Sequence, residues 1–404
     1  MPTVRVRVRS LGGRTMAPDP RAPVVIVGGG FGGLFTALAL AERHGHPPIL
    51  LIEPQDRFLF LPLLYELLSH ELRTWEVAPR YDTLLAGRGV AWLQDRVTQI
   101  DPTQRQITTA SGRQIGYGQA VIATGSTTQS FGIPGVADHA LRFRSLADVE
   151  RLQHLIQQLK QQRRPLQRLA VVGGGASGVE LACKLADELD GCAVLELLEQ
   201  GPELLSGSPS FNREQALQAL QRRDVRIRTG AAVAAVGSDH LLVGPERERI
   251  GVEAVIWTAG IRCQPPKLTA TDPFPSQDGR GRLRCHPDLR VQGVDHLFAI
   301  GDVAHVDDPA LEQTLPSNAQ VAFQQARCLA DNLRRGANGE ALQAFAYRDL
   351  GEMMSLGRGE ACLTGSGVTL AGRAAFELRK LAYLTRMPGR SHKLKVAAGW
   401  LTDW

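Results

Sequence analysis

The segment Val24-Val-Ile-Val-Gly28-Gly-Gly30-Phe-Gly-Gly33 joins a short β-branched run to the glycine spacing G-x-G-x-x-G. In a strand–turn–helix unit, the first glycine allows a tight turn and the second lets the backbone approach a pyrophosphate. The third lets the helix pack closely on the strand. A second copy, Leu169-Ala-Val-Val-Gly173-Gly-Gly175-Ala-Ser-Gly178, follows later in the chain. Two copies predict two dinucleotide sites in one protein, and therefore electron transfer between two cofactors.

An acidic residue completes each copy at the expected distance of about 20 residues. Glu53 ends the apolar run Ile49–Ile52, and Glu199 ends the run Ala193–Leu198. A carboxylate at this place accepts hydrogen bonds from an adenosine ribose, and it repels a 2′-phosphate. Glu199 therefore favours NADH over NADPH at the second site.

Further strand-like runs end in residues suited to a cofactor crevice. The run Ala120–Ala123 ends in Thr124-Gly125, and Ala254–Thr258 ends in Ala259-Gly260 as a near repeat. The run Leu297–Ile300 ends in Gly301-Asp302. A carboxylate just past a strand end lies where open α/β sheets bind ligands, although it also suits a helix N-cap.

The repetition of fingerprint, acid and strand predicts an α/β protein with two Rossmann-like dinucleotide-binding domains, the second inserted in the first. The length of 404 residues accommodates both. We predict the following division: a disordered leader at 1–22, the first domain at 23–140 and 285–345, the second at 141–284, and a C-terminal membrane-associating region at 346–404.

Composition narrows the class of protein. The net charge of +5 is mild, and no apolar run approaches the roughly 18 residues of a spanning helix. The six cysteines form no C-x-x-C pair, which argues against a disulfide framework and a structural metal. We therefore predict no metal site and no nucleic-acid partner.

The C-terminal region from Ala371 to Trp404 interleaves basic and apolar residues. Anionic headgroups attract such a cluster, and apolar side chains and tryptophans can enter the headgroup boundary. We expect the apolar members of this region to take part in membrane docking: Phe376, Leu381, Tyr383, Leu384, Trp400, Leu401 and Trp404. We expect its basic members to attract the headgroups: Arg373, Arg379, Lys380, Arg386, Arg390, Lys393 and Lys395. The alternative is that these side chains cover the first domain or a homodimer interface.

With these motifs the chain resembles the type II NAD(P)H:quinone oxidoreductases. More specific than the fingerprints is Ala319-Gln320-x-Ala322-x-Gln324-Gln325. The segments Leu61–Ser69, Trp75–Pro79 and Asp349–Gly357 are similar to the cyanobacterial and chloroplast branch, which reduces demethylphylloquinone and other prenylquinones. This chain departs from many respiratory members of the family at Leu350, where those members carry Lys.

The resemblance implies FAD at the first fingerprint and NAD(P)H at the second. It implies that Asp302 binds the ribityl chain and that Ala319 and Gln320 lie against the flavin. Glu180, Gln320 and Gln324 are the expected catalytic residues, Glu180 and Gln320 orienting a prenylated quinone and assisting its protonation. The implied enzyme pumps no protons and lies on the cytoplasmic side of a membrane as a peripheral protein.

Other interpretations compete with the quinone reductase. A sulfide:quinone reductase needs cysteines against the flavin, and a ferredoxin reductase leaves the apolar C-terminal region unexplained. A flavin-bearing redox sensor with little turnover is a third possibility. The physiological quinone does not follow from the sequence.

Overall fold

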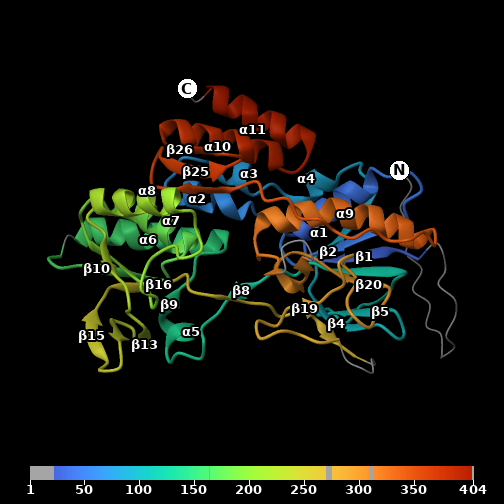
Figure 1. The fold of residues 1–404 in the computed structure, drawn as a ribbon, viewed down its shortest axis with the longest axis horizontal. Coiled ribbons are helices and arrows are strands. Elements are labelled where there is room, and N and C mark those ends of the chain that lie inside the picture. The colour runs from blue at the N-terminus through green and yellow to red at the C-terminus, as the bar shows by residue number, and fades with distance from the viewer. Residues whose placement is uncertain (1–21, 163, 270–274, 309–312, 403–404) are drawn as a thin grey trace. The chain divides into compact units, whose positions relative to one another are not determined.

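The computed structural model describes residues 22–162, 164–269, 275–308 and 313–402. The predicted leader therefore lies, apart from residue 22, outside the described residues, as does Trp404. The chain divides into two compact units (Figure 1). Unit 1 comprises 1–58, 80–127 and 262–347, and unit 2 comprises 59–79, 128–261 and 348–404.

Unit 1 is built on a five-stranded parallel sheet in the order β20-β7-β1-β2-β3. Strands β1, β2, β7 and β20 are mostly buried apolar runs, as expected of a parallel sheet covered on both faces, whereas the edge strand β3 is partly exposed. Their bounds are β1 (Val24–Val27), β2 (Ile49–Ile52), β3 (Val90–Leu93), β7 (Gln119–Ile122) and β20 (Leu297–Ala299).

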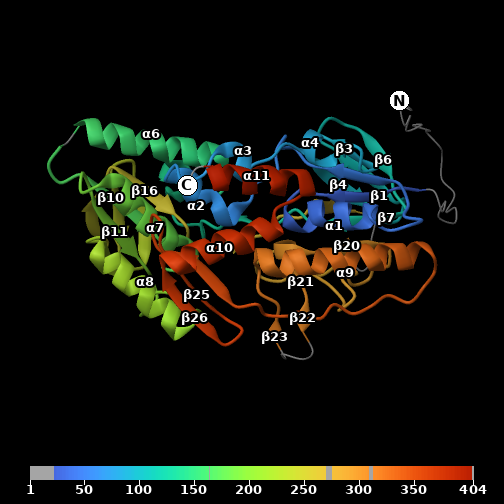
Figure 2. The same ribbon diagram turned by 90° about the horizontal axis from the view of Figure 1, so that it is seen from above.

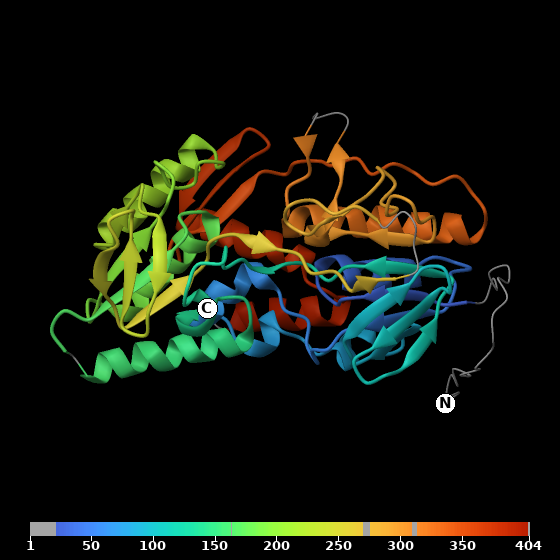
Figure 3. The same ribbon diagram turned by 90° about the horizontal axis from the view of Figure 1, so that it is seen from below.

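Two helices of unit 1 pack against each other beside this sheet, α1 (Phe31–Ala41) and α9 (Ala319–Ala337) (Figure 2). The cyan strands of a second sheet lie beside the blue parallel strands (Figure 3). That sheet contains β4 (Val97–Asp101), β5 (Gln106–Thr109), β6 (Gln114–Gly116) and β18 (Lys267–Leu268).

The shorter elements of unit 1 connect these layers. They are α4 (Tyr81–Leu85), β19 (Leu283–Arg284), η2 (Gly301–Val303), β21 (Ala304–His305), β22 (Asp307–Asp308) and β23 (Gln313–Thr314). At the unit boundaries lie β8 (Thr127–Thr128) and β17 (Ile261–Arg262).

Unit 2 repeats the parallel sheet in the order β12-β11-β10-β16-β9. Alternate residues of β10 face opposite layers, as strand geometry requires. Leu169 and Val171 join the core under the helices, whereas Ala170 and Val172 join the core under an antiparallel three-stranded sheet (Figure 1). The bounds are β9 (Ala140–Leu141), β10 (Arg168–Val172), β11 (Val194–Leu198), β12 (Arg226–Arg228) and β16 (Ala254–Trp257).

The layers on either side of this sheet are regular. The helical layer is α6 (Leu146–Gln162), α7 (Ala176–Leu189) and α8 (Ser210–Arg222). The antiparallel sheet is β13 (Val233–Val236), β14 (His240–Val243) and β15 (Glu248–Gly251), next to α5 (Val136–His139).

Unit 2 also contains the C-terminal region and residues 59–79. A second antiparallel sheet, β24 (Glu352–Ser355), β25 (Ala361–Gly365) and β26 (Val368–Gly372), packs against α7, α8 and α10. The remaining elements are η1 (Leu61–Leu63), α2 (Leu64–Leu68), α3 (Thr74–Val77), α10 (Arg373–Arg386) and α11 (Arg390–Thr402). In the described residues, none of these helices is long and apolar enough to span a bilayer.

Candidate functional site

Four strands of unit 1 end together at the carboxyl edge of its sheet. The register pairs Val27 with both Ile52 and Ile122, and Ile122 in turn with Ala299. The residues after these strand ends are therefore neighbours. The edge brings together the first fingerprint, Glu53, Thr124-Gly125 and Asp302, in the crevice where parallel sheets bind ligands.

The glycines of the first fingerprint have separate roles. Gly28 has a φ of +101°, and a Cβ added there would lie 2.5 Å from the Ala123 carbonyl oxygen. A Cβ at Gly33 would lie 1.8 Å from the Gly28 carbonyl oxygen, so only glycine lets α1 approach the turn. A Cβ at Gly30 would meet nothing within 4 Å. The N-terminus of α1 therefore has open space of the kind that a pyrophosphate needs.

Glu53 closes the first turn from the side. Its Oε2 accepts a hydrogen bond from the Gly29 N–H at 2.7 Å, and its Oε1 accepts one from the Gln55 N–H at 2.9 Å. Burial raises the pKa of Glu53, and these backbone bonds oppose that rise. Each oxygen keeps a second lone pair, so the carboxylate can still accept a ribose hydroxyl.

Asp302 lies in η2 beside the end of β7. The Ser126 hydroxyl donates to Asp302 Oδ2 at 2.6 Å, and the Cys263 thiol contacts the Asp302 carbonyl oxygen at 3.1 Å. Gly125 adopts a φ of +66°, which turns the chain away after the exposed Thr124. Ser126 and Cys263 were not predicted from the sequence; Ser126 directly follows the Thr-Gly motif.

The predicted glutamine motif begins α9. Asn318 caps the helix by accepting a hydrogen bond from the Val321 N–H at 2.9 Å. Gln325 Oε1 accepts one from the Gly301 N–H at 2.7 Å, which ties α9 to the strand end that carries Asp302. Gln320 is half-buried one turn from Gln324, and its Oε1 accepts from the Tyr347 hydroxyl at 3.2 Å. The start of α9, including Ala319, is thus fixed next to η2.

Unit 2 reproduces the glycine turn. A Cβ at Gly178 would lie 1.8 Å from the Gly173 carbonyl oxygen, and one at Gly175 would meet nothing within 4 Å. Thr258 Oγ1 donates to the Val172 carbonyl at 2.9 Å, which ties the end of β16 to the turn. Gly260 has a φ of +66°, the same value as Gly125 in unit 1.

Glu199 occupies the position in unit 2 that Glu53 occupies in unit 1. Its Oε2 accepts from the Gly174 N–H at 2.6 Å, and its Oε1 accepts from the Gly201 N–H at 2.7 Å. Both units thus present a glycine turn, open space at a helix N-terminus and a carboxylate beside it. These features fit two dinucleotides, one in each unit.

Glu180 lies on α7, two residues beyond Gly178, and is buried. Its Oε1 accepts a hydrogen bond from the Ser355 N–H at 2.8 Å, and it lies 3.5 Å from Arg379 Nη2. Burial raises the pKa of Glu180 to about 7, although Arg379 opposes the rise. A carboxyl with such a pKa can donate or accept a proton near neutrality.

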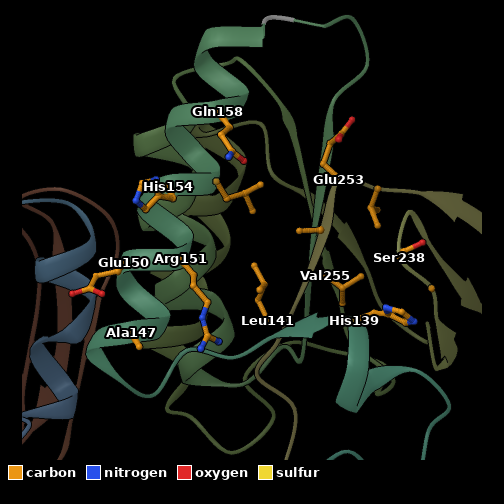
Figure 4. A pocket seen from close by; sticks show the side chains of 14 residues that line it. His139, Leu141, Ala147, Glu150, Arg151, His154, Gln158, Ser238, Glu253 and Val255 are labelled. Carbon is orange, nitrogen blue, oxygen red and sulfur yellow. The ribbon is translucent and has the colours of Figure 1, made fainter.

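A cavity of about 530 Å³ lies elsewhere in unit 2 (Figure 4). Its walls include His154 and Gln158 of α6, Leu141 of β9 and Val255 of β16. These walls involve the amino-terminal half of β16, whereas the glycine turn follows the carboxyl ends of the strands. The cavity is therefore separate from the dinucleotide crevice.

Comparison with known proteins identifies the family. Residues 22–326 match the model of the pyridine nucleotide-disulphide oxidoreductases. The chain is 40% identical over 400 residues to the demethylphylloquinone reductase of Synechocystis sp., covering 96% of this chain and 98% of that protein. The chain belongs to the type II NAD(P)H:quinone oxidoreductases.

A plant relative and a solved structure agree with this placement. The type II oxidoreductase is 33% identical over 425 residues to the alternative NAD(P)H-ubiquinone oxidoreductase C1 of Arabidopsis thaliana, covering 95% of this chain and 81% of that protein. The structure of NDH2 from Plasmodium falciparum in complex with NADH superposes with a TM-score of 0.82 at 18% identity, covering 95% of this chain and 98% of that one. That likeness shows that the two chains share one fold.

The C-terminal expectations for this type II oxidoreductase need correction. Trp400 is buried, and its Nε1 donates to Glu76 Oε1 at 2.8 Å. Phe376 and Tyr383 are also buried, within the core of unit 2, and Arg379 is fully buried against Glu66. The prediction that Phe376, Tyr383 and Trp400 contact a membrane was wrong, because an amphipathic helix that packs on its own protein has the same residue pattern.

Proposed function

We propose that this chain is a flavin-dependent NAD(P)H:quinone oxidoreductase that binds FAD in unit 1 and NAD(P)H in unit 2. The single observation that carries the proposal is the pair of matched cradles, Gly28–Gly33 with Glu53 and Gly173–Gly178 with Glu199, in a chain of this family. Bound FAD supplies the redox chemistry, accepting a hydride from NAD(P)H and reducing a quinone to its quinol.

The residues of unit 1 hold the flavin cofactor. The N-terminus of α1 stabilises the pyrophosphate charge, and Glu53 accepts the adenosine ribose hydroxyls. Asp302, oriented by Ser126, accepts a hydroxyl of the ribityl chain. Because Gln325 fixes the start of α9 beside this aspartate, Ala319 and Gln320 form the adjacent wall of the site.

Unit 2 prefers NADH to NADPH. The neighbouring strand β12 brings Arg228 next to Glu199, whose N–H donates to the Arg228 carbonyl at 2.8 Å. The Arg228 guanidinium pairs with Glu248 at 2.6 Å and lies 3.5 Å from Glu196. These carboxylates already neutralise the adjacent cation, so Glu199 dominates the charge that a 2′-phosphate would meet.

The quinone is of the prenylated naphthoquinone or plastoquinone class. The support is the demethylphylloquinone reductase relative, which is similar over nearly the whole chain. Gln320 and Gln324 orient the quinone oxygens through their side-chain amides. Glu180 donates a proton to the reduced ring, as its position in a buried, partly neutralised environment allows.

Unit 2 docks on a membrane surface through α10 and α11. The exposed leucines of these helices provide the apolar contact: the predicted Leu381 and Leu401, and also Leu378 and Leu394, with exposures of 57%, 79%, 45% and 71%. Trp75, which is 37% exposed, lies beside α11 at Gly399. Lys393 and Lys395 supply positive charge for anionic headgroups. A homodimer interface is the competing use of this face.

Exposed positions test the membrane proposal without disturbing the core. Truncation before α10 is unsuitable, because it removes the buried Arg379. Leu394→Glu with Leu401→Glu should abolish co-sedimentation with anionic liposomes at low salt while flavin binding is unchanged. Leu166→Glu is the matched control, since Leu166 is an exposed leucine that lies outside α10 and α11. Equal sedimentation of the double variant and the wild type, or loss of dimer instead of lipid binding, would refute the docking.

An acceptor screen tests the function itself. Flavin-loaded protein is assayed for electron transfer from NADH to a soluble naphthoquinone, to a benzoquinone or to ferredoxin, and from sulfide to the naphthoquinone. We expect turnover with the naphthoquinone to exceed all other arms. Turnover only with sulfide or ferredoxin would assign one of the related flavoproteins, and no turnover with any acceptor would assign a redox sensor.

A further inference from the structure

Unit 2 gathers five charged side chains in one cluster, of which four are buried and Glu71 is half-buried. Their side-chain exposures are 0% for Glu66 and Lys184, 1% for Arg379, 12% for Glu180 and 19% for Glu71. They come from α2, the loop that follows it, α7 and α10. Such a concentration of buried charge is costly unless the members neutralise one another.

The cations divide unequally among the carboxylates. Arg379 Nη1 donates to Glu66 Oε1, and its Nη2 donates to the Pro62 carbonyl at 2.7 Å. Lys184 Nζ donates to Glu71 Oε2 and lies 3.9 Å from Glu66 Oε1. Glu71 also accepts from the Ser69 hydroxyl and from the Gly359 N–H at 3.0 Å. Glu66 and Glu71 thus each accept a hydrogen bond directly from a cation.

Glu180 has fewer and longer contacts with cations than Glu66 and Glu71 have. It has one backbone donor, the Ser355 N–H, and it shares Arg379 with Glu66 at the longer distance of 3.5 Å. Its position on α7, four residues before Lys184, places it on the same helix face as that lysine. Glu180 is therefore the carboxyl of the cluster that lies furthest from a cation.

The count of charges gives the protonation state. Three carboxyl groups face two cations, so the buried cluster is neutral when one carboxyl carries a proton. The other titratable groups around Glu180 leave this count unchanged, since burial raises the pKa of Tyr65, Cys183, Cys362 and Tyr383 and keeps them neutral. Nearby, Glu352 of β24 binds Asn212 and Ser208, and on α10 Lys380 pairs with Glu377.

We propose that Glu71 and Lys184 are positioning residues that make Glu180 the holder of the single proton of this cluster. The inference rests on the proposed function, in which Glu180 delivers that proton to the quinone. Lys184 neutralises Glu71 and contributes to neutralising Glu66. The charge of Arg379 is therefore shared between Glu66 and Glu180. Burial raises the pKa of Glu180 to about 7, in agreement with the charge count.

Charge-count variants test the proposal. Lys184→Met leaves three carboxyls against one cation, and it should raise the titration midpoint of Glu180 by about one unit or more. Glu71→Gln leaves two against two and keeps hydrogen-bonding groups, and it should lower the midpoint by a similar amount. The double variant again has one carboxyl in excess and should titrate within a few tenths of a unit of wild type. Lys184→Arg should restore the wild-type midpoint.

Two readouts are needed. Infrared absorption of the protonated carboxyl, assigned with Glu180→Gln, follows the proton during a pH titration without any turnover. Stopped-flow oxidation of the reduced enzyme by a naphthoquinone follows its use, and the rate should fall as pH rises through the midpoint. Lys160→Met, which removes an exposed lysine at the end of α6, is the matched control and should shift neither readout.

The outcomes distinguish the role of Glu71 and Lys184 from the proposed reduction of a quinone. Folded single variants with unmoved infrared midpoints would overturn the role of Glu71 and Lys184, as would a double variant that titrates like Lys184→Met alone. A wild type that fails to reduce any quinone, while the infrared midpoints shift as expected, would overturn the proposed function and leave the cluster assignment standing.

Discussion

In unit 1 the carbonyl of Gly29 accepts a hydrogen bond from the Tyr81 hydroxyl at 2.8 Å, whereas in unit 2 the equivalent Gly174 carbonyl accepts one from the Leu205 N–H at 2.9 Å. The same buried polar group thus has a side-chain donor in one unit and a main-chain donor in the other. Unit 1 also places Asp302 after the strand next to β7, whereas in unit 2 the strand next to β16 is followed by Arg142.

These differences indicate different uses of one cradle. The backbone of the glycine turn is repeated, as the proposed binding of a pyrophosphate by each unit requires. Unit 1 has additional side chains that can hold a cofactor or support its turn: Tyr81, Ser126 and Asp302. We interpret unit 1 as the site of a resident cofactor and unit 2 as the site of one that exchanges at every turnover.

The largest expected effect comes from the glycines that touch the turn. Gly33→Ala and Gly178→Ala each place a Cβ 1.8 Å from a carbonyl oxygen, and overpacking of this kind typically costs about 1–3 kcal/mol. We expect Gly33→Ala to be purified without flavin. Gly178→Ala should keep its flavin and lose about tenfold or more in kcat/KM for NADH, a free-energy change of about 1.4 kcal/mol. Loss of flavin from both variants would contradict the division between the units.

Gly30→Ala and Gly175→Ala sharpen the comparison, because an added Cβ meets no protein atom within 4 Å at either position. As flavin-free apoproteins, both variants should therefore unfold at the Tm of the wild-type apoprotein. Gly30→Ala should bind FAD weakly, and Gly175→Ala should raise the KM for NADH with flavin content unchanged. A lowered Tm of the apoprotein would mean that these glycines are structural.

Sequence patterns correctly predicted which residues follow the ends of the parallel strands. The fingerprints, Glu53, Glu199 and Asp302 are local signals, and parallel strands bring their carboxyl ends to one edge. The partners of Glu180 could not be predicted, since Ser355 lies 175 positions further along the chain and Arg379 lies further still. Trp400 was misjudged because interleaved basic and apolar residues do not show whether lipid or the protein itself covers the apolar side chains.

A smaller effect is expected at Glu199. Repulsion between two unit charges about 4 Å apart amounts to about 1–4 kcal/mol, depending on screening. Glu199→Ala should therefore reduce the ratio of kcat/KM for NADH over NADPH by about tenfold. Glu53→Ala is the counterpart in unit 1, and it should weaken flavin retention while the nucleotide ratio stays constant. An unchanged ratio in Glu199→Ala would show that the carboxylate does not meet the ribose.

The smallest expected effect is at Tyr81. Tyr81→Phe removes the hydrogen bond to the Gly29 carbonyl, which contributes about 1 kcal/mol on average. We expect a modest decrease in the free energy of unfolding and a few-fold weaker binding of FAD, with an unchanged KM for NADH. A change in the KM for NADH would contradict the assignment of the Tyr81 hydroxyl to the flavin site of unit 1.

The central claim is that unit 1 retains FAD and that unit 2 delivers NADH to it. Anaerobic titration of the purified protein with NADH, monitored by the visible absorption of oxidised flavin, tests it most directly. Wild type should be bleached by one equivalent of NADH and should recover its absorption on addition of a naphthoquinone, and Gly175→Ala should require a higher NADH concentration. A folded wild-type protein that lacks the flavin absorption, or whose flavin NADH does not bleach, would contradict the account.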